Sequence, residues 1–385
     1  MFLSETVISE DTLPEFEFFK DRCDSNCTFP HDHVSPETLA HFPKNCSAVC
    51  SYLLLDETSD LTETELVEVF RNMKTLYGSL RVRKTKFTSA KFLDGLEKIE
   101  CDSGDSIEFL SNDEMIEVGM KRLESTSCGI YIQHSLNFTR LNLPMLKNFS
   151  TPSPCQPPLK LRINGLAGNF CIRIEEATHF LASDFIQIQS ISSPFCILSE
   201  SDISIFQDKI CEIKNFSLST FDPNCTRVFG NVVVRAGDEH YVEKLKLVTW
   251  IYGEVLVEGT NLAKIDFFDS LQCVASFNVS GYYGQRRLIL IKDNPNLKSV
   301  SFPSLKKITA FGEKYFMIQG NHPHLGKDYR SCMKIKDSLN SSVWDVPTIE
   351  GKSCKQILEV YGDDSVADNK IGSVCIGIIL WSFFF

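Results

Sequence analysis

Basic residues are scarce relative to acidic ones in this chain. Its 39 lysines and arginines are outnumbered by 50 aspartates and glutamates, which gives a net charge of −11 over 385 residues. A protein that binds nucleic acid needs an excess of basic side chains to hold the phosphate backbone. The composition therefore argues against a nucleic-acid partner.

The sequence also lacks the short motifs of common catalytic sites. It contains no G-x-S-x-G, no P-loop and no Rossmann glycine pattern, so we expect a non-catalytic protein without a cofactor. The alternative is an extracellular carbohydrate-active enzyme, because parallel β-helices also host polysaccharide-cleaving sites with paired carboxylates. Against it, the strand positions expected to face outward hold no repeated aspartate pair. They hold Arg81, Arg83, Gln133, Arg162, Arg235 and Glu254.

Long uncharged apolar segments are rare as well. Residues 1–20 carry five acidic side chains and lack an apolar run, so they do not form a secretory signal peptide as written. Residues 371–385 are uncharged and apolar, but they fall short of the ~20 residues that a membrane-spanning helix needs. This hydrophobic C-terminal segment resembles the signal for a lipid anchor. We expect any membrane attachment to involve it.

Cysteine, in contrast, is abundant. Fifteen cysteines among 385 residues exceed what a reduced cytosolic protein usually carries, and they indicate an oxidising compartment with disulfide bonds. Eight Asn-x-Ser/Thr sequons point the same way, because such sequons accept glycans in secreted proteins. The predicted glycosylation sites are Asn26, Asn45, Asn137, Asn148, Asn215, Asn224, Asn278 and Asn340. We therefore expect an extracellular or cell-surface glycoprotein.

The N-terminal cysteines allow two interpretations. Two cysteine pairs stand near histidines, and thiolate and imidazole ligands at close spacing suit tetrahedral zinc. The residues concerned are Cys23, Cys27, Cys46, Cys50, His31, His33 and His41. Disulfides are favoured, because sequons overlap Cys27 and Cys46 and the usual CxxC spacing of zinc knuckles is missing. A zinc-binding intracellular protein remains the alternative.

An internal repeat is the most informative feature of the sequence. At an offset of 175 the matched pairs are Cys50/Cys225, Tyr77/Tyr252, Gly78/Gly253, Leu80/Val255, Val82/Val257, Thr85/Thr260, Phe92/Phe267 and Leu96/Leu271. At an offset of 159 they are Ile130/Ile289, Ile132/Ile291, Leu143/Phe302, Pro144/Pro303 and Leu146/Leu305. The chain therefore contains two copies of one unit.

The change of offset predicts an insertion of 16 residues between Ile99 and Ile130 of the first copy. Cys101 and Cys128 bracket this acidic stretch. We expect them to form a disulfide that closes the inserted loop. The same alignment places Ser135 opposite Asn294.

Each copy alternates short strands with leucine-spaced segments. Alternate strand residues face inward, and a proline such as Pro144 or Pro303 ends the strand where the chain turns. One rung cannot bury its apolar face alone, so several rungs must stack. The pattern predicts a mainly β solenoid with short helices, whose outward residues form a flat docking surface.

Motifs in a fixed order connect the chain to a known family. The first copy carries Gly78-Ser79-Leu80-Arg81-Val82, Phe92-Leu93-x-x-Leu96-x-x-Ile99, Leu141-x-Leu143-Pro144-x-Leu146 and Asn169-x-Cys171-Ile172-x-x-Glu175-Glu176. The second carries Gly253-x-Val255-x-Val257, Phe267-Phe268-x-x-Leu271, Ile291-x-x-Asn294, Phe302-Pro303-x-Leu305-x-x-Ile308 and Ile318-x-x-Asn321. Both copies resemble the receptor L domain, the leucine-rich β-helical module of insulin-receptor and EGF-receptor ectodomains. The ending of the first copy looks like that of nematode proteins of this type.

The resemblance implies two tandem right-handed β-helix L domains. Residues 1–44 form an N-terminal extension, 45–190 the first L domain, 191–222 a linker, 223–335 the second L domain, 336–370 a polar tail and 371–385 the hydrophobic segment. The second copy departs from the pattern after Asn321, where His322 and Pro323 replace a cysteine and paired glutamates. Neither a furin-like region nor a kinase is present in the sequence, so the resemblance implies a kinase-less ectodomain.

The resemblance also implies an extracellular partner, either an insulin-like or EGF-like peptide or a receptor ectodomain. The basic run that ends in Lys84 and Lys86 is a candidate contact for an acidic partner, because these lysines follow the predicted strand 80–82. The acid pairs Glu175-Glu176 and Asp363-Asp364 are interpreted as solvated acids of loops or helix starts.

Overall fold

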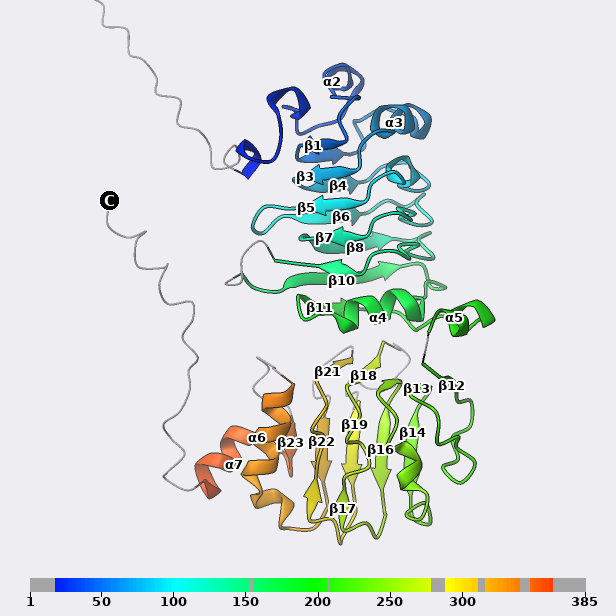
Figure 1. The fold of residues 1–385 in the computed structure, drawn as a ribbon, viewed down its shortest axis with the longest axis vertical. Coiled ribbons are helices and arrows are strands. Elements are labelled where there is room, and N and C mark those ends of the chain that lie inside the picture. Colours follow the sequence, from blue (N-terminus) through cyan, green and yellow to red (C-terminus); the bar gives the residue numbers. More distant parts are fainter. Residues whose placement is uncertain are drawn as a thin grey trace, which may run out of the picture. The chain divides into compact units, whose positions relative to one another are not determined.

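The chain forms two compact units, Met1–Ile191 and Ser192–Phe385. The computed structural model describes residues 18–151, 156–206, 208–277, 288–310, 316–339 and 347–362. Both units are mainly β with few short helices (Figure 1), as the sequence predicts. The described strands form several small sheets that are parallel except for the antiparallel pair β23 (Thr348–Ile349) and β24 (Lys352–Ser353). The described residues do not close into one continuous helix.

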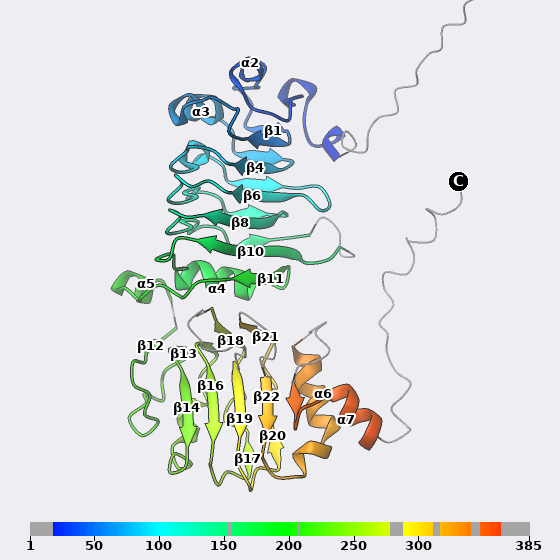
Figure 2. The same ribbon diagram turned by 180° about the vertical axis from the view of Figure 1, so that it is seen from behind.

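Unit 1 is a stack of coils that contribute strands alternately to two parallel sheets (Figures 1 and 2). The first sheet has the order β1-β3-β5-β7-β9 and the second β2-β4-β6-β8-β10-β11. The bounds are β1 Ala48–Cys50, β2 Leu53–Leu55, β3 Thr75–Tyr77, β4 Leu80–Arg83, β5 Lys98–Glu100, β6 Ser106–Leu110, β7 Ser125–Thr126, β8 Gly129–Ser135, β9 Asn148–Phe149, β10 Leu159–Leu166 and β11 Ile186–Ile191. The helices are η1 Ser25–Cys27, α2 Pro36–Leu39, α3 Glu63–Phe70, η2 Lys91–Leu93 and α4 Ile174–Ala182.

Strand alternation builds the core of unit 1. In β8, Ile130 and Ile132 are buried while Tyr131 and Gln133 face outward. The corner between β3 and β4 requires glycine, because Gly78 has a φ of +129° and a Cβ there would lie 1.9 Å from the Ser51 carbonyl oxygen. Because Gly78 has no side chain, adjacent coils can approach at this corner to the spacing of hydrogen-bonded parallel strands.

Unit 2 repeats this plan. Its sheets have the orders β12-β13-β15-β18-β21 and β14-β16-β19-β22-β23-β24, and β17 pairs with β20. The strands are β12 Ile210–Glu212, β13 Arg227–Phe229, β14 Val232–Arg235, β15 Trp250–Tyr252, β16 Val255–Glu258, β17 Lys264–Ile265, β18 Cys273–Ser276, β19 Ile289–Lys292, β20 Ser299–Val300, β21 Lys307–Ala310, β22 Phe316–Gln319, β23 Thr348–Ile349 and β24 Lys352–Ser353. The helices are α5 Glu200–Ile205, η3 Val242–Leu245, η4 Leu325–Lys327, α6 Tyr329–Ser338 and α7 Cys354–Tyr361.

Helices α6 and α7 lie beside the last strands of unit 2 (Figure 1). Ile335 of α6 and Ile357 of α7 belong to the core of this unit, and the disulfide Cys332–Cys354 joins the two helices. Residues 348–361 therefore pack on unit 2, although the sequence suggested a polar tail there. The apolar face of α7 is short, so a composition count over 336–370 does not reveal it.

A buried asparagine links neighbouring coils of unit 1. The Asn112 side-chain oxygen accepts hydrogen bonds from the Thr85 backbone N–H at 2.9 Å and the Thr85 hydroxyl at 2.8 Å, and its amide donates to the Val82 carbonyl at 2.8 Å. The Asn112 N–H donates to the Ser135 hydroxyl on the next coil. These bonds satisfy backbone groups that the coil corner leaves unpaired.

Unit 2 contains the same arrangement. The Asn294 side-chain oxygen accepts from the Thr260 N–H at 2.9 Å and the Thr260 hydroxyl at 2.6 Å, and its amide donates to the Val257 carbonyl at 3.2 Å. The Asn294 N–H donates to the Asn321 side chain at 3.1 Å. Two asparagines therefore occupy equivalent corners of the two units.

This equivalence corrects the alignment of the repeat. Asn112 corresponds to Asn294, and Ser135 corresponds to Asn321, so the predicted match of Ser135 with Asn294 is wrong. The stretch between β5 and β7 is not an inserted loop, because it contains β6, which pairs with β4 and β8. Apolar strand residues recur in every coil, so the two copies can also be aligned with their coils shifted by one. The equivalent hydrogen bonds of Asn112 and Asn294 occur in only one alignment.

Strand pairing also corrects the match of Cys50 with Cys225. Cys50 pairs with Tyr77, and Phe229 pairs with Tyr252. Since Tyr77 and Tyr252 are equivalent, Cys50 corresponds to Phe229. The turns that follow have different lengths, because α3 of unit 1 is longer than η3 of unit 2.

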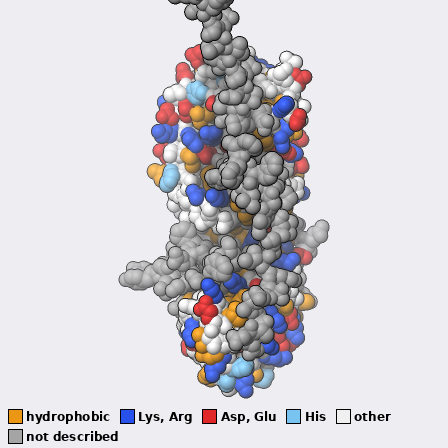
Figure 3. All heavy atoms as spheres, turned by 90° about the vertical axis from the view of Figure 1, so that its left-hand side faces the viewer, with side chains coloured by type: hydrophobic (Ala, Val, Ile, Leu, Met, Phe, Trp, Pro, Cys, Tyr) orange, Lys and Arg blue, Asp and Glu red, His pale blue; other side chains and the backbone are white. Residues whose placement is uncertain are grey.

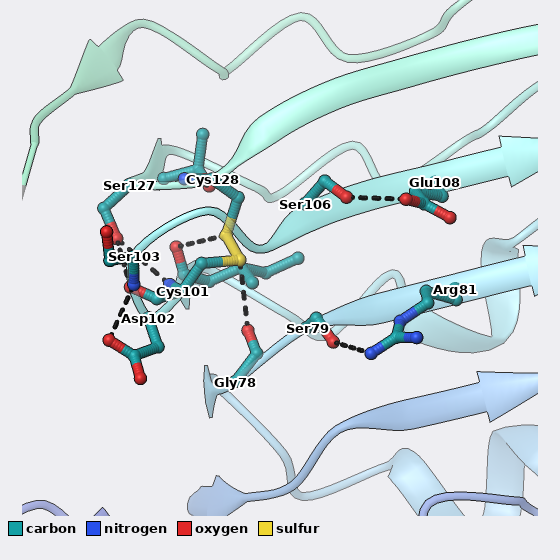
Figure 4. The surroundings of a disulfide bond; sticks show 12 residues. Gly78, Ser79, Arg81, Cys101, Asp102, Ser103, Ser106, Glu108, Ser127 and Cys128 are labelled. Atoms are coloured by element: carbon teal, nitrogen blue, oxygen red, sulfur yellow. Dashed lines mark hydrogen bonds between the residues drawn. A yellow bond between two sulfur atoms is a disulfide. The ribbon is translucent and has the colours of Figure 1, made fainter. Parts of the chain in front are cut away.

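Disulfides join successive coils. Cys101 follows β5 and is bonded to Cys128, which follows β7 on the next coil (Figure 4). The predicted pair is therefore joined, but it bridges two regular coils. In unit 2, Cys211 is bonded to Cys225. Cys171 and Cys196 are disulfide-bonded as well.

The N-terminal cysteines are also oxidised. Cys23 is bonded to Cys50, and Cys27 is bonded to Cys46. Zinc binds cysteine in its thiolate form. None of these four sulfur atoms is a thiolate, because all four are joined in disulfides. The zinc interpretation is therefore wrong for this form of the chain. His33 instead lies 3.0 Å from the Asp56 carboxylate.

Helix α4 carries a buried carboxyl group. Glu176 is 3 % exposed and accepts a hydrogen bond from the Leu143 N–H at 2.7 Å. The interpretation of Glu176 as a solvated acid is therefore wrong, although it does lie in the first turn of a helix. Burial raises the pKa of the Glu176 carboxyl, and the Leu143 N–H and the Arg173 charge oppose that effect only in part.

Replacing Glu176 with glutamine is expected to stabilise unit 1 more at pH 7 than at pH 4. The folded state holds the Glu176 proton to a higher pH than the unfolded chain, so the wild type loses stability as pH rises through the folded pKa. Glutamine cannot ionise and keeps an oxygen for the Leu143 N–H. Urea unfolding of both proteins at the two pH values measures the difference. An equal effect of the substitution at both pH values would contradict this account.

Candidate binding faces

The outward surface of the second sheet of unit 1 is named face 1. Its central row crosses four strands in register. The row consists of Arg81, Glu108, Tyr131 and Arg162, and Gln133 and Asn164 lie beside it in the next row. Alternation along each strand brings these side chains to one surface, because their neighbours in sequence point into the core.

Charged groups on face 1 are paired across strands. The Arg83 Nε donates to the Glu108 carboxylate at 3.0 Å, and the Ser106 hydroxyl donates to the same carboxylate at 2.8 Å. Figure 4 shows Ser106 and Glu108 on β6 beside Arg81 on β4. Glu108 is thus held as an ion-pair partner with no second carboxylate next to it in the row. This is unlike the acid pair that glycoside hydrolysis uses.

An amide ladder continues face 1 toward β11. Gln133 donates to the Asn164 oxygen at 2.8 Å, and the Asn164 amide donates to the Ser190 hydroxyl at 3.0 Å. The Arg162 guanidinium lies 5.4 Å from the centre of the Tyr131 ring. Cross-strand contacts of this kind hold long side chains in place. A partner would therefore meet a preorganised polar surface, with less side-chain freedom to lose.

The corresponding surface of unit 2 is named face 2 and differs in chemistry. Its central row is Leu256, Leu290 and Met317, which are in register on β16, β19 and β22. Each is partly exposed, while its neighbours on the strand are buried. An apolar row on the solvent side of a sheet is typical of an interaction surface.

A charged row flanks the apolar row of face 2. Glu258 lies between Arg235 and Lys292 in register, with distances from its carboxylate of 2.8 Å to Arg235 Nε and 3.0 Å to Lys292 Nζ. Hydrogen bonds from Arg235 and Lys292 hold the pKa of the Glu258 carboxyl below its usual value. Face 2 therefore has an apolar centre with a polar border, the arrangement found at protein interfaces.

The predicted contact residues lie beside these faces. Lys84 and Lys86 are exposed in the turn after β4, and Lys84 lies 3.6 Å from the Glu57 carboxylate. Among the coloured side chains of Figure 3, basic and acidic groups are interspersed in each unit. No group of three or more potential metal ligands occurs within the described residues.

Six predicted glycosylation sites lie on the surface of the structure. The exposed asparagines are Asn26, Asn45, Asn137, Asn148, Asn215 and Asn224. Asn278 and Asn340 lie outside the described residues, as do Asp363, Asp364 and the hydrophobic segment 371–385. Within the ranges the structure describes, no helix has the length and hydropathy to cross a bilayer.

Face 2 is the part of the site that sequence reasoning missed. Arg235 is recognisable in the sequence as an outward residue because it is charged, whereas Leu256, Leu290 and Met317 are apolar and are not among the residues expected to face outward. Their signal is an apolar residue at an outward strand position, as in Val255-Leu256-Val257 and Ile289-Leu290-Ile291. A strand with one solvent face would have a polar residue there.

Comparison with known proteins identifies both units. The model of the receptor L domain matches residues 45–144 and 224–337, which together are more than half of the chain. No curated protein matches the sequence. The matched segments contain β1–β8 and β13–β22, the strands that carry most of faces 1 and 2. The chain belongs to the receptor L domain family.

Proposed function

We propose that this chain is a non-catalytic, kinase-less binding protein of the extracellular space or cell surface. Its partner is a peptide growth factor or a receptor ectodomain, and insulin-like or EGF-like ligands follow from the resemblance alone. The protein acts as a decoy, co-receptor or modulator, of the type seen in nematodes, and each unit winds as a right-handed solenoid. Disulfides, exposed sequons and membership of the receptor L domain family support this compartment and role.

The observation that carries the proposal is the apolar row of face 2. Leu256, Leu290 and Met317 are partly exposed in one row of the sheet. The paired charges of Arg235, Glu258 and Lys292 flank this row on one side. Burying such side chains contributes about 25 cal/mol per Å² of apolar surface removed from water. A partner with a complementary apolar patch would gain most of its affinity there.

Changing Leu290 to aspartate is expected to weaken partner binding at least tenfold. The substitution places a charge in the centre of the contact, where it must be desolvated. The purified, glycosylated protein is first screened against extracellular peptides and receptor ectodomains by surface plasmon resonance, and the variant is then measured with each partner found. Leu247→Asp is the control, since Leu247 is 53 % exposed and lies outside face 2. Equal binding by Leu290→Asp and wild type would contradict the proposal, and so would glycan cleavage by a protein that binds no partner.

A further inference from the structure

The first coils of the two units differ at one edge of the second sheet. In unit 1, β2 is the edge strand, and a segment of the N-terminal extension runs beside it. The Leu54 N–H donates to the Asp32 carbonyl at 2.8 Å, and the Val34 N–H donates to the Leu54 carbonyl at 2.9 Å. His33 and Leu54 form a parallel bridge. The edge of unit 1 is thus completed by the chain's own residues 32–34.

In unit 2, the equivalent edge strand is β14. Val233 corresponds to Leu54, because Val233 pairs with Leu256 as Leu54 pairs with Arg81. The Val232 N–H donates toward β16, so the N–H and carbonyl of Val233 point to the opposite side. Neither group has a hydrogen-bond partner in the described part of the chain, whereas the next outward N–H, that of Arg235, donates to Asp238 at 2.9 Å.

The chain approaches this edge but does not pair with it. Phe29 of unit 1 donates its N–H to the Cys50 carbonyl at 2.9 Å, and Ile213 of unit 2 makes the same bond to the Phe229 carbonyl at 2.8 Å. Residues 30–34 then return to β2 in unit 1. Residues 214–217 of unit 2 instead form one wall of a cavity of about 550 Å³, and β14 forms the other.

We infer that this cavity, named the edge slot, binds an extended peptide segment of a partner protein as an added strand beside β14. The incoming backbone makes with Val233 the two hydrogen bonds that residues 32–34 make with Leu54. Addition of a strand to an open sheet edge is a general mode of peptide recognition, and the slot has the volume of an ordinary ligand site. The occupant is an extended segment because residues 32–34, which bridge to Leu54, fill the equivalent position in unit 1.

The walls of the edge slot define the side chains it accepts. In unit 1, Val34 follows the bridged residue and is completely buried. The corresponding residue of the incoming strand meets the partly buried Ile213 and Phe216, which pack against the core of unit 2. The partner segment therefore has an apolar residue directly after the residue that bridges to Val233, and alternating β-branched or aromatic residues favour the extended form.

The test uses random ten-residue peptides displayed on phage and selected on the whole, glycosylated protein. Selected peptides are synthesised and measured by titration calorimetry. Each selected peptide is also measured with Asn215→Gln, because Asn215 lines the slot and is a predicted glycosylation site. Val233→Pro removes the outward N–H and is expected to weaken binding at least tenfold, while Val233→Thr keeps the N–H and binds normally. Proline is tolerated on an edge strand whose N–H has no partner. Leu54→Pro, in contrast, removes a bond that is made and lowers the stability of unit 1.

Hydrogen exchange gives a second readout that needs no variant. The segment 231–235 of β14 is expected to gain protection when a selected peptide binds. The inference is overturned if no peptide binds with a Kd below about 100 µM, or if the selected peptides bind Val233→Pro as well as wild type. It is also overturned if Val233→Pro abolishes self-association of the protein instead, because the occupant would then be a second copy. The edge slot shares Arg235 with face 2, so each selected peptide is also measured with Leu290→Asp, which changes face 2 and leaves the slot intact. Normal binding by this variant shows that the peptide occupies the slot and separates this test from that of the proposed function.

Discussion

Replacing Asn112 with alanine is expected to lower the free energy of unfolding of unit 1 by about 3 kcal/mol or more. The substitution leaves the Thr85 N–H, the Thr85 hydroxyl and the Val82 carbonyl without their partner. All three groups lie in a corner where Asn112 and Thr85 are buried, so water does not readily replace the amide. An unsatisfied buried polar group costs about 1–3 kcal/mol.

Urea unfolding followed by circular dichroism measures the effect. Asn294→Ala is expected to destabilise unit 2 by a similar amount, because Asn294 makes the equivalent bonds. Asn296→Ala is the control, since Asn296 is exposed and its loss removes no described contact. A change below about 1 kcal/mol in Asn112→Ala, within the range of ordinary surface substitutions, would show that the asparagine does not link the coils.

Removing the disulfide between Cys101 and Cys128 is expected to destabilise unit 1 by about 3 to 4 kcal/mol. The bond closes a loop of 27 residues, and opening it restores conformational freedom to the unfolded chain. The double variant Cys101→Ala and Cys128→Ala avoids leaving a buried hydroxyl at either position, since both cysteines are almost fully buried.

The measurement compares the unfolding free energies of the variant and the wild type under oxidising conditions. In the presence of a reductant the difference is expected to disappear, because the wild type then lacks the same bond. A variant as stable as the oxidised wild type would contradict the pairing. In the folded protein, burial raises the pKa of the Cys273 thiol to about 12, which disfavours the thiolate that would attack a disulfide.

Much of the architecture is predictable from the sequence, because its signals are local. Alternation of apolar residues identifies strands such as β8, glycine at position 78 marks a coil corner, and the repeated motif order points to the receptor L domain. The registration of the two copies is not predictable in this way. The corner asparagines Asn112 and Asn294 are recognised only when their partners Thr85 and Thr260 are seen in space.

The sites are less predictable than the fold. The burial of Glu176 depends on Leu143, which is 33 residues away in sequence. The edge slot exists because residues 214–217 do not return to pair with β14. In unit 1, by contrast, residues 32–34 do return and bridge to β2. Whether an N-terminal segment such as 32–34 covers an edge is decided by long-range pairing, which local propensity does not encode.

Faces 1 and 2 have the same position in the two units but opposite character. Arg81 of face 1 corresponds to Leu256 of face 2, so equivalent strands carry different outward residues. A polar, internally bonded surface favours specificity and an apolar one favours affinity.

Hydroxyl-radical footprinting of the protein, free and bound to a partner from the screen, tests the central claim most directly. The account predicts that oxidation of Met317 and Leu290 on face 2, or of Tyr131 on face 1, falls several-fold on binding, while exposed Leu247 is unaffected. Unchanged oxidation at all three positions, with protection elsewhere on the surface, would contradict it.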